Sequence, residues 1–360
     1  MVAATSEINM AKQLKNILPL NKSLALIICA LLLSHLSVIA QDRQADNMLL
    51  FQRSYGGWAK HFNKQIVNYQ ATYSPQQINE IRARVNDEDA TIDNKATTKE
   101  IRYLLSVYAK HKTPSYLQAA EKGIEYLLKA QYKNGGWPQY YPSVKDYHGQ
   151  VTYNDHAMVN VLNLLKDLTG KKSTFEVLDA TLAAKASAAI ERGIQCILKT
   201  QVVVNNKLTA WAAQYDPSTL KPADARKFEP AGLSSMESVG IIQFLMRIEN
   251  PSPQVVAAIE HAKAWFETAA IKGYESKIIP DANQPKGVDR ILVSAEKNTT
   301  WARFYDINTN QPFFCGRDGI KKNMLSQIEV ERRVGYAWYG EWPQNLLDKQ
   351  YPKWKLNNLQ

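Results

Sequence analysis

A tryptophan motif recurs four times along this chain. Each copy consists of Trp, a small residue or Pro, two variable residues and an aromatic residue, and successive copies are 79, 74 and 90 residues apart. The four copies begin at Trp58, Trp137, Trp211 and Trp301. A period of this length accommodates two helices with their loops, so the repeat predicts a closed ring of helical hairpins. Chance recurrence among eight tryptophans is the alternative, and four aligned copies disfavour it.

Six segments carry apolar residues at the spacing of an amphipathic helix, and no alternating strand pattern of comparable length competes with them. They are residues 99–110, 116–132, 156–169, 180–200, 235–247 and 253–269. Three prolines interrupt the helical pattern over residues 216–230, which are therefore expected to form a displayed loop. The expected fold is all-α, a helical toroid with long functional loops.

Two of the expected helices open on similar sequences. Residues 91–97, Thr-Ile-Asp-Asn-Lys-Ala-Thr, resemble residues 152–158, Thr-Tyr-Asn-Asp-His-Ala-Met, and residues 234–238 open a third helix in a similar way. In a ring of hairpins these starts meet at one end of the central axis. The side chains brought together there would be Asp93, Asn94, Asn154, Asp155 and Glu237.

Helix capping is the alternative interpretation of these polar residues. Asp and Asn are common N-caps, and Thr97 and Glu100 have the spacing of a capping box. Each helix needs only one such cap, however, and both starts carry an Asp/Asn pair. The surplus side chains therefore favour an additional role.

The N-terminus has the composition of a secretory signal. Lysines precede an apolar run over residues 24–40 that ends in small residues, with cleavage expected after Ala40. We therefore expect a signal peptide over residues 1–40, a single catalytic domain over residues 41–360, and export to the periplasm, the cell surface or the medium. An uncleaved membrane anchor is the alternative, and the serines and histidine within the run disfavour it.

Charge narrows the class of partner. The chain carries a net charge of +10, but its basic residues are scattered and no nucleic-acid-binding motif is present. This pattern favours an acidic small molecule or polymer over DNA or RNA.

Converging carboxylates repel one another unless a cation joins them or one is protonated. Oxygen-rich side chains without His or Cys partners suit Ca²⁺, so the converging group is a candidate calcium site. Arginines concentrate in the last quarter of the chain, at positions 303, 317, 332 and 333. They would clamp carboxylates bidentately, or alternatively form internal salt bridges to Asp318, Glu329 and Glu331.

Calcium, arginines and aromatic platforms together suggest a polymer of sugar acids. Neutralising a uronate carboxylate acidifies the proton on the adjacent carbon, so that a base can remove it while the 4-linked sugar leaves. This reaction is a β-elimination.

These segments resemble polysaccharide lyase family 10, the pectate lyases with an (α/α)₃ barrel. The resemblance runs from about residue 55 to residue 343. Besides the two similar helix starts, it rests on residues 134–139 (Asn-Gly-Gly-Trp-Pro-Gln), 225–229 (Ala-Arg-Lys-Phe-Glu), 235–240 (Ser-Met-Glu-Ser-Val-Gly), 317–319 (Arg-Asp-Gly) and 331–336 (Glu-Arg-Arg-Val-Gly-Tyr).

The resemblance implies calcium-dependent cleavage of polygalacturonate, with Arg226 as the base. It assigns Asp93 and Asp155 to calcium, and it implies a monomer. Substrate contacts are implied for Lys227, Arg303, Arg317 and Asn94. An arginine base is demanding because its pKa lies above about 12, so Arg226 binding a carboxylate while another group takes the proton stays open. Lys95 stands where relatives are expected to have a small residue, and it could weaken metal binding or contact substrate.

Two other functions remain possible from the residues. A hydrolase would use Asp93 and Asp155 as acid and base, need no cation and release saturated products. A carbohydrate-binding protein would bind without turnover and tolerate loss of Arg226. The concentration of arginines favours the lyase, because a neutral sugar has no need of them.

Overall fold

The computed structural model describes residues 42–170 and 173–358, and these residues belong to one compact unit. The predicted signal peptide lies outside the described residues. Within the described residues, no helix is both long enough and apolar enough to cross a membrane.

Six helices correspond to the predicted ones, and their bounds agree within a few residues. They are α5 (Thr98–His111), α6 (Pro114–Ala130), α7 (Ala157–Thr169), α8 (Ala180–Thr200), α9 (Ser235–Leu245) and α10 (Pro253–Ala269). Other helices are α3 (Arg43–Phe51), α4 (Pro75–Ala83), α11 (Val330–Gly335), α12 (Tyr351–Asn358) and a π-helical turn, Leu346–Gln350.

The boundaries follow from ordinary local chemistry. In α10, Ser252 accepts a hydrogen bond from the backbone N–H of Val255, and Pro253 occupies the first turn, where no donor is needed. In α7, apolar residues recur at helical spacing and are buried along one face, and Gly170 follows the last helical residue.

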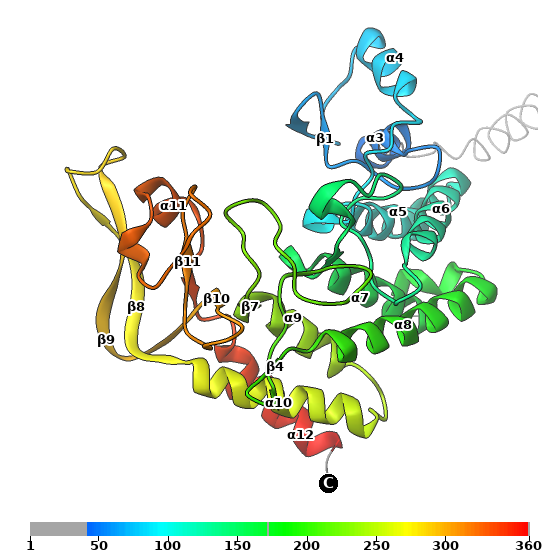
Figure 1. Cartoon of the computed structure of the whole chain (residues 1–360). Helices are drawn as coiled ribbons and strands as arrows, with labels where there is room; N and C mark the ends of the chain where they lie inside the picture. Colours follow the sequence, from blue (N-terminus) through cyan, green and yellow to red (C-terminus); the bar gives the residue numbers. More distant parts are fainter. Residues whose placement is uncertain (1–41, 171–172, 359–360) are drawn as a thin grey trace, which may run out of the picture. The chain divides into compact units, whose positions relative to one another are not determined.

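The helices form three successive antiparallel pairs. Helix α5 packs on α6, α7 on α8, and α9 on α10, and each pair also contacts the next one through α5–α7, α6–α8, α7–α9 and α8–α10 (Figure 1). We propose that this succession is the (α/α)₃ arrangement expected from the sequence.

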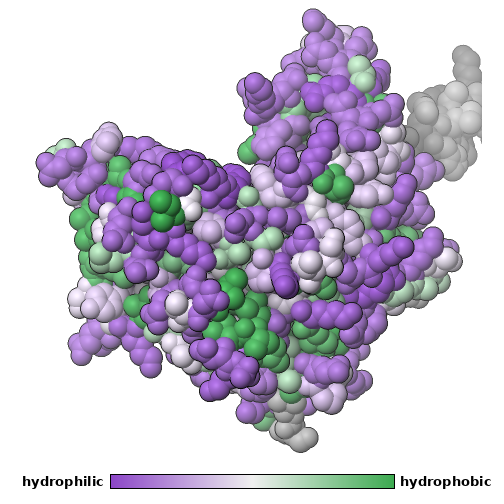
Figure 2. All heavy atoms as spheres, viewed as in Figure 1, coloured by the Kyte–Doolittle hydropathy of each residue, from purple (hydrophilic) through white to green (hydrophobic). Residues whose placement is uncertain are grey.

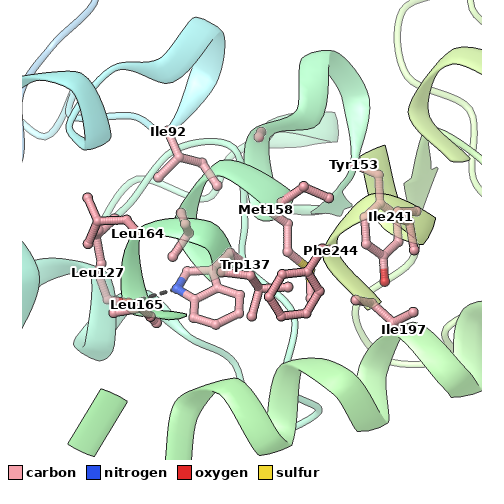
Figure 3. Packing of buried hydrophobic residues seen from close by; sticks show 14 of the residues in the cluster. Ile92, Leu127, Trp137, Tyr153, Met158, Leu164, Leu165, Ile197, Ile241 and Phe244 are labelled. Atoms are coloured by element: carbon pink, nitrogen blue, oxygen red, sulfur yellow. Dashed lines mark hydrogen bonds between the residues drawn. The ribbon is translucent and has the colours of Figure 1, made fainter. Parts of the chain in front are cut away.

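The tryptophan repeat is a structural repeat. All four tryptophans are buried, and each indole N–H donates to a backbone carbonyl near the end of the preceding helix, at 2.7–2.8 Å. Figure 3 shows Trp137 packed among apolar side chains of several helices. The preceding glutamine then joins consecutive units. Gln131, for example, donates to Gly135 in its own loop and to Ala189 in α8, and Gln52 and Gln201 make equivalent pairs of bonds.

The sequence analysis did not predict the long strands of this fold. Strands β8 (Ile271–Pro280) and β9 (Val288–Ala302) form a long antiparallel hairpin, with β13 (Tyr339–Gly340) on the other side of β9 (Figure 1). Both strands are rich in β-branched and aromatic residues. Most of their side chains are only half-buried or exposed, so the two faces differ too little to give a clean alternation.

In the described part of the chain, five pairs of two-residue antiparallel strands lie in the loops that connect the helices. They are β1 (His61–Phe62) with β2 (Gln65–Ile66), β3 (Val151–Thr152) with β6 (Gln214–Tyr215), β4 (Val203–Val204) with β5 (Lys207–Leu208), β7 (Leu233–Ser234) with β10 (Phe304–Tyr305), and β11 (Phe314–Cys315) with β12 (Lys321–Lys322). The predicted loop over residues 216–230 is non-helical, as expected. Cys196 and Cys315 are both buried free thiols.

Candidate functional site

The two similar helix starts contain short turns of the same backbone conformation, although α7 begins directly after its turn and α5 begins two residues further on. Short 3₁₀ turns, Asp93–Lys95 and Asn154–His156, precede α5 and α7. Asn94 and Asp155 occupy equivalent left-handed positions with φ of 47° and 50°, and the next residue in each turn also has a positive φ. Such conformations are uncommon outside glycine and are kept where the surrounding structure fixes them.

The capping interpretation was wrong for these residues. Neither aspartate caps its helix, and Thr97 makes no capping bond to α5. Its hydroxyl instead donates to the Thr91 carbonyl and accepts the Trp58 N–H, so it ties the helix start to the tryptophan motif. The aspartates are consequently available for other partners.

The predicted convergence of the helix starts is confirmed. The turn containing Asp93 packs against the turn containing Asp155, which in turn packs against α9. Burial raises the pKa of Asp155, and the nearby charges of Glu237 and Asp93 raise it further. The carboxylates therefore interact electrostatically.

One cation already lies within this acidic group. Arg303 is only 6% exposed, and its Nη2 lies 2.7 Å from Oε1 of the fully buried Glu237 and 3.6 Å from Oδ1 of Asp155. Glu237 also accepts bonds from the Ser234 hydroxyl and, at 3.4 Å, from the Asp155 N–H. Burial opposes its ionisation, but Arg303 and Ser234 hold the pKa of Glu237 below its usual range. Arg303 thus fixes the Asp155 turn, and its Nε is buried without a partner among the described residues.

Asp93 has a separate counter-ion. Lys60 Nζ lies 2.7 Å from Asp93 Oδ2, and the Asn94 amide donates to the same oxygen at 3.0 Å. Burial opposes ionisation, yet the Lys60 contact holds the pKa of Asp93 below its ordinary value. Gln139 is a further neighbour of Asp93, and its side-chain oxygen is buried without a donor among the described residues.

The arginines form a second group. Arg226 is exposed and makes a bidentate ion pair with Glu229, at 2.7 and 2.5 Å, which raises the pKa of its guanidinium. Arg317 pairs in the same way with Glu331, at 3.2 and 2.6 Å. The salt-bridge alternative is therefore correct for Arg317.

Arg332 differs from its neighbours. It is only 6% exposed and pairs with no carboxylate among the described residues, and burial lowers its pKa. Arg333 pairs with Asp289 on the β8–β9 hairpin, at 2.7 Å to both oxygens, and not with the predicted acidic residues. Lys227 is exposed.

A pocket and a histidine lie between the two groups. The pocket is lined by Asn154 from the acidic group, Glu229 from the arginine group and the side chains of Phe304 and Tyr336. His148 packs against Tyr140 and Tyr147, with ring centroids 4.7 and 4.1 Å away. Burial lowers the pKa of His148, the charge of Asp93 opposes this shift, and the charge of Arg226 adds to it. The acidic group and the arginine group therefore lie close together, with Tyr336 in contact with both Arg303 and Arg332. The face of the molecule seen in Figure 2 is mostly hydrophilic.

Sequence reasoning missed Lys60, Gln139 and His148, and it named Arg332 only as one of several carboxylate-binding arginines. A signal for two of them was present in the tryptophan repeat, because its third position holds Lys60, Gln139, Ala213 and Arg303. In the structure Lys60 and Arg303 hold a carboxylate of a helix start, and the Ala213 carbonyl accepts the N–H of Asn154. The third position of the tryptophan motif therefore contacts a helix start in each of these three units.

Comparisons with known proteins agree with this picture. The sequence model of the pectic acid lyase family matches residues 52–347. Two solved structures of a family 10 polysaccharide lyase from Cellvibrio cellulosa, one of them an aspartate-to-alanine mutant in complex with trigalacturonic acid, are 30% identical to this chain. Each alignment covers 86% of this chain and 92% of the other, with a TM-score of 0.75. No curated protein matches. The chain therefore belongs to the pectic acid lyase family and is a polysaccharide lyase of family 10.

Proposed function

We propose that this protein is a calcium-dependent pectate lyase that cleaves α-1,4-polygalacturonate by β-elimination and releases unsaturated oligogalacturonides. The observation that carries the proposal is that the carboxylate group and the arginine group approach one another across Tyr336, in a chain of this family. The Tyr336 ring lies 4.8 Å from the guanidinium carbon of Arg303 and 4.9 Å from that of Arg332. The oligogalacturonate bound to the related Cellvibrio enzyme supports a galacturonate polymer as substrate. The predicted export would bring the enzyme to pectin outside the cytoplasm.

The arginine group supplies the electrostatics that elimination needs. A guanidinium on the uronate carboxylate stabilises the charge that develops as the C5–H bond breaks. The electron pair then forms the C4–C5 double bond, and the glycosidic oxygen leaves C4 and takes up a proton. Arg226 is the proposed base, and Lys227, Arg317 and Asn94 are proposed substrate contacts. Arg303 is also proposed to interact with substrate, although its pair with Glu237 first makes it a support for Asp155.

The residues present fit a calcium ion. Asp93, Asp155 and the amide oxygens of Asn94 and Asn154 provide oxygen ligands only. Gln139, whose side chain contacts Asp93, carries a further buried oxygen without a donor among the described residues. When bound there, calcium would neutralise uronate carboxylates. The two alternative functions place different demands on this site. A two-carboxylate hydrolase would need one of its carboxyl groups protonated, and a carbohydrate-binding protein would need no base.

The assay is ultraviolet absorbance of unsaturated uronate ends during incubation of the purified protein with polygalacturonate, with calcium or with a chelator. A calcium-dependent rise is expected. An increase in reducing ends without an increase in absorbance would show that the protein is a hydrolase. Binding of the polymer without either signal would show that it is a carbohydrate-binding protein without catalysis. Neutral polymers such as amylose serve as the control and are expected to give no product.

Lys60 is predicted to compete with calcium for Asp93, because its ammonium occupies one carboxylate oxygen at 2.7 Å. Lys60→Met should therefore bind Ca²⁺ about tenfold more tightly than wild type, measured by calorimetry without substrate. Lys95→Met, which removes an exposed lysine two residues from Asp93, is the matched control and should change the affinity much less. Unchanged or weaker binding by Lys60→Met would contradict the competition.

A further inference from the structure

Three guanidinium groups of the arginine group surround a single aromatic ring. The guanidinium carbons of Arg226, Arg317 and Arg332 lie 5.0, 4.5 and 4.7 Å from the centroid of the Phe228 ring. The three arginines come from separate segments: the loop after β6, the loop after β11, and α11. The Phe228 ring is thus in contact with an arginine from each of the three segments.

Such a cluster of like charges is not self-stabilising. Glu331 raises the pKa of Arg317, and the charge of Arg226 opposes that rise. Burial lowers the pKa of Arg332, and the charge of Arg317 lowers it further, as expected for neighbouring like charges. Glu229 and Glu331 neutralise two of the arginines, but Arg332 has no carboxylate among the described residues. The negative face of an aromatic ring attracts guanidinium groups and opposes this repulsion.

The ring itself is held in place. Phe228 is half-buried and packs against a core cluster that includes Phe304, Phe314 and Trp338. Two backbone hydrogen bonds close the turn around it, from Ala225 N–H to the Glu229 carbonyl at 3.0 Å and from Glu229 N–H to the Arg226 carbonyl at 2.7 Å. A ring anchored in this way can fix the guanidinium groups relative to the pocket, whose wall includes Glu229.

We propose that Phe228 is a positioning residue that gathers Arg226, Arg317 and Arg332 into one cationic surface for the carboxylates of the substrate. The role rests on the proposed function, because it requires an anionic polymer. It acts through the arginines and needs no contact between Phe228 and the sugar. Leucine at this position would keep an apolar contact with the core but would lack the ring face that attracts the guanidinium groups.

Phe228→Leu and Phe228→Tyr separate the ring from its packing. We expect Phe228→Leu to raise KM for polygalacturonate about tenfold, with kcat also reduced through Arg226, whereas Phe228→Tyr stays within about twofold of wild type. Phe314→Leu is the control: it loses aromatic packing in the same core cluster and should lower Tm without raising KM. Unchanged KM in Phe228→Leu, or equal KM in the leucine and tyrosine variants, would overturn the proposal.

A substrate-free measurement distinguishes this proposal from the proposed function. In protein labelled at arginine, the Nε–H NMR signals of Arg226, Arg317 and Arg332 should shift in Phe228→Leu and stay near wild type in Phe228→Tyr. Shifted signals with unchanged KM would mean that the cluster exists but does not bind the polymer, which contradicts the role proposed for the arginines in the lyase. Unshifted signals would overturn the positioning role itself, whatever the wild-type activity.

Discussion

Replacing Arg226 with alanine is expected to lower kcat for polygalacturonate elimination by about 10³-fold, within the range of a general base. The reason is positional as well as chemical: Arg226 lies on the loop beside the pocket and is exposed enough to reach a bound polymer. The measurement is the initial rate of absorbance increase at saturating substrate and calcium. Lys207→Ala, which removes an exposed cation from the short β4–β5 hairpin, should retain wild-type kcat.

The ion pair between Arg226 and Glu229 allows a test of whether Arg226 acts as the base or only binds a substrate carboxylate. Glu229 raises the pKa of Arg226, which is opposite to what a base requires, so proton removal needs Arg226 to leave this partner. If Arg226 is the base, Glu229→Gln lowers its pKa, and kcat at alkaline pH should increase. If Arg226 only holds a carboxylate, its charge is the same in both proteins and that increase should be absent. A kcat for Arg226→Ala within tenfold of wild type would contradict the base role directly.

The helical part of the fold was predictable because its signals are local. Apolar periodicity predicted residues 253–269 as a helix, which are the bounds of α10, and the recurring tryptophan predicted repeated helical units. The convergence of the turns that carry Asp93 and Asp155 followed from the similar helix starts, because equivalent turns in neighbouring units lie side by side. The additional carboxylate, Glu237, was predicted on the same grounds.

The remaining features depend on partners far apart in sequence. Nothing near Arg333 indicates that it will pair with Asp289, which lies 44 residues away on a hairpin. Glu331, in contrast, was close enough in sequence to Arg317 to be named as a partner. The β8–β9 hairpin was missed because half-buried strands give little alternation, and the Phe228 cluster because cation–π contacts leave no sequence period.

Replacing Glu237 with glutamine is expected to lower the free energy of unfolding by about 3–5 kcal/mol, because it leaves the buried charge of Arg303 without its closest carboxylate. The change should appear as a fall in Tm of about 10 °C in thermal unfolding followed by circular dichroism. Glu331→Gln is the matched control, since it also removes a carboxylate from an arginine pair. That pair is solvent-exposed on both sides, so little change in Tm is expected.

The pH dependence gives a second, independent readout of the same pair. The folded pKa of Glu237 lies below its ordinary value of 4.5, so its contribution to stability is present above that pH and is lost as the pH falls through the lower folded value. Wild type should therefore lose stability more steeply than Glu237→Gln in this acidic range, and the two curves should approach one another at low pH. Parallel curves for the two proteins would mean that Glu237 keeps an ordinary pKa. A wild-type Tm for Glu237→Gln would mean that Asp155 alone neutralises Arg303.

Arg303 also lies close to Asp155, so the loss of stability in Glu237→Gln should be accompanied by weaker Ca²⁺ binding. Glu331→Gln should bind Ca²⁺ as the wild type does.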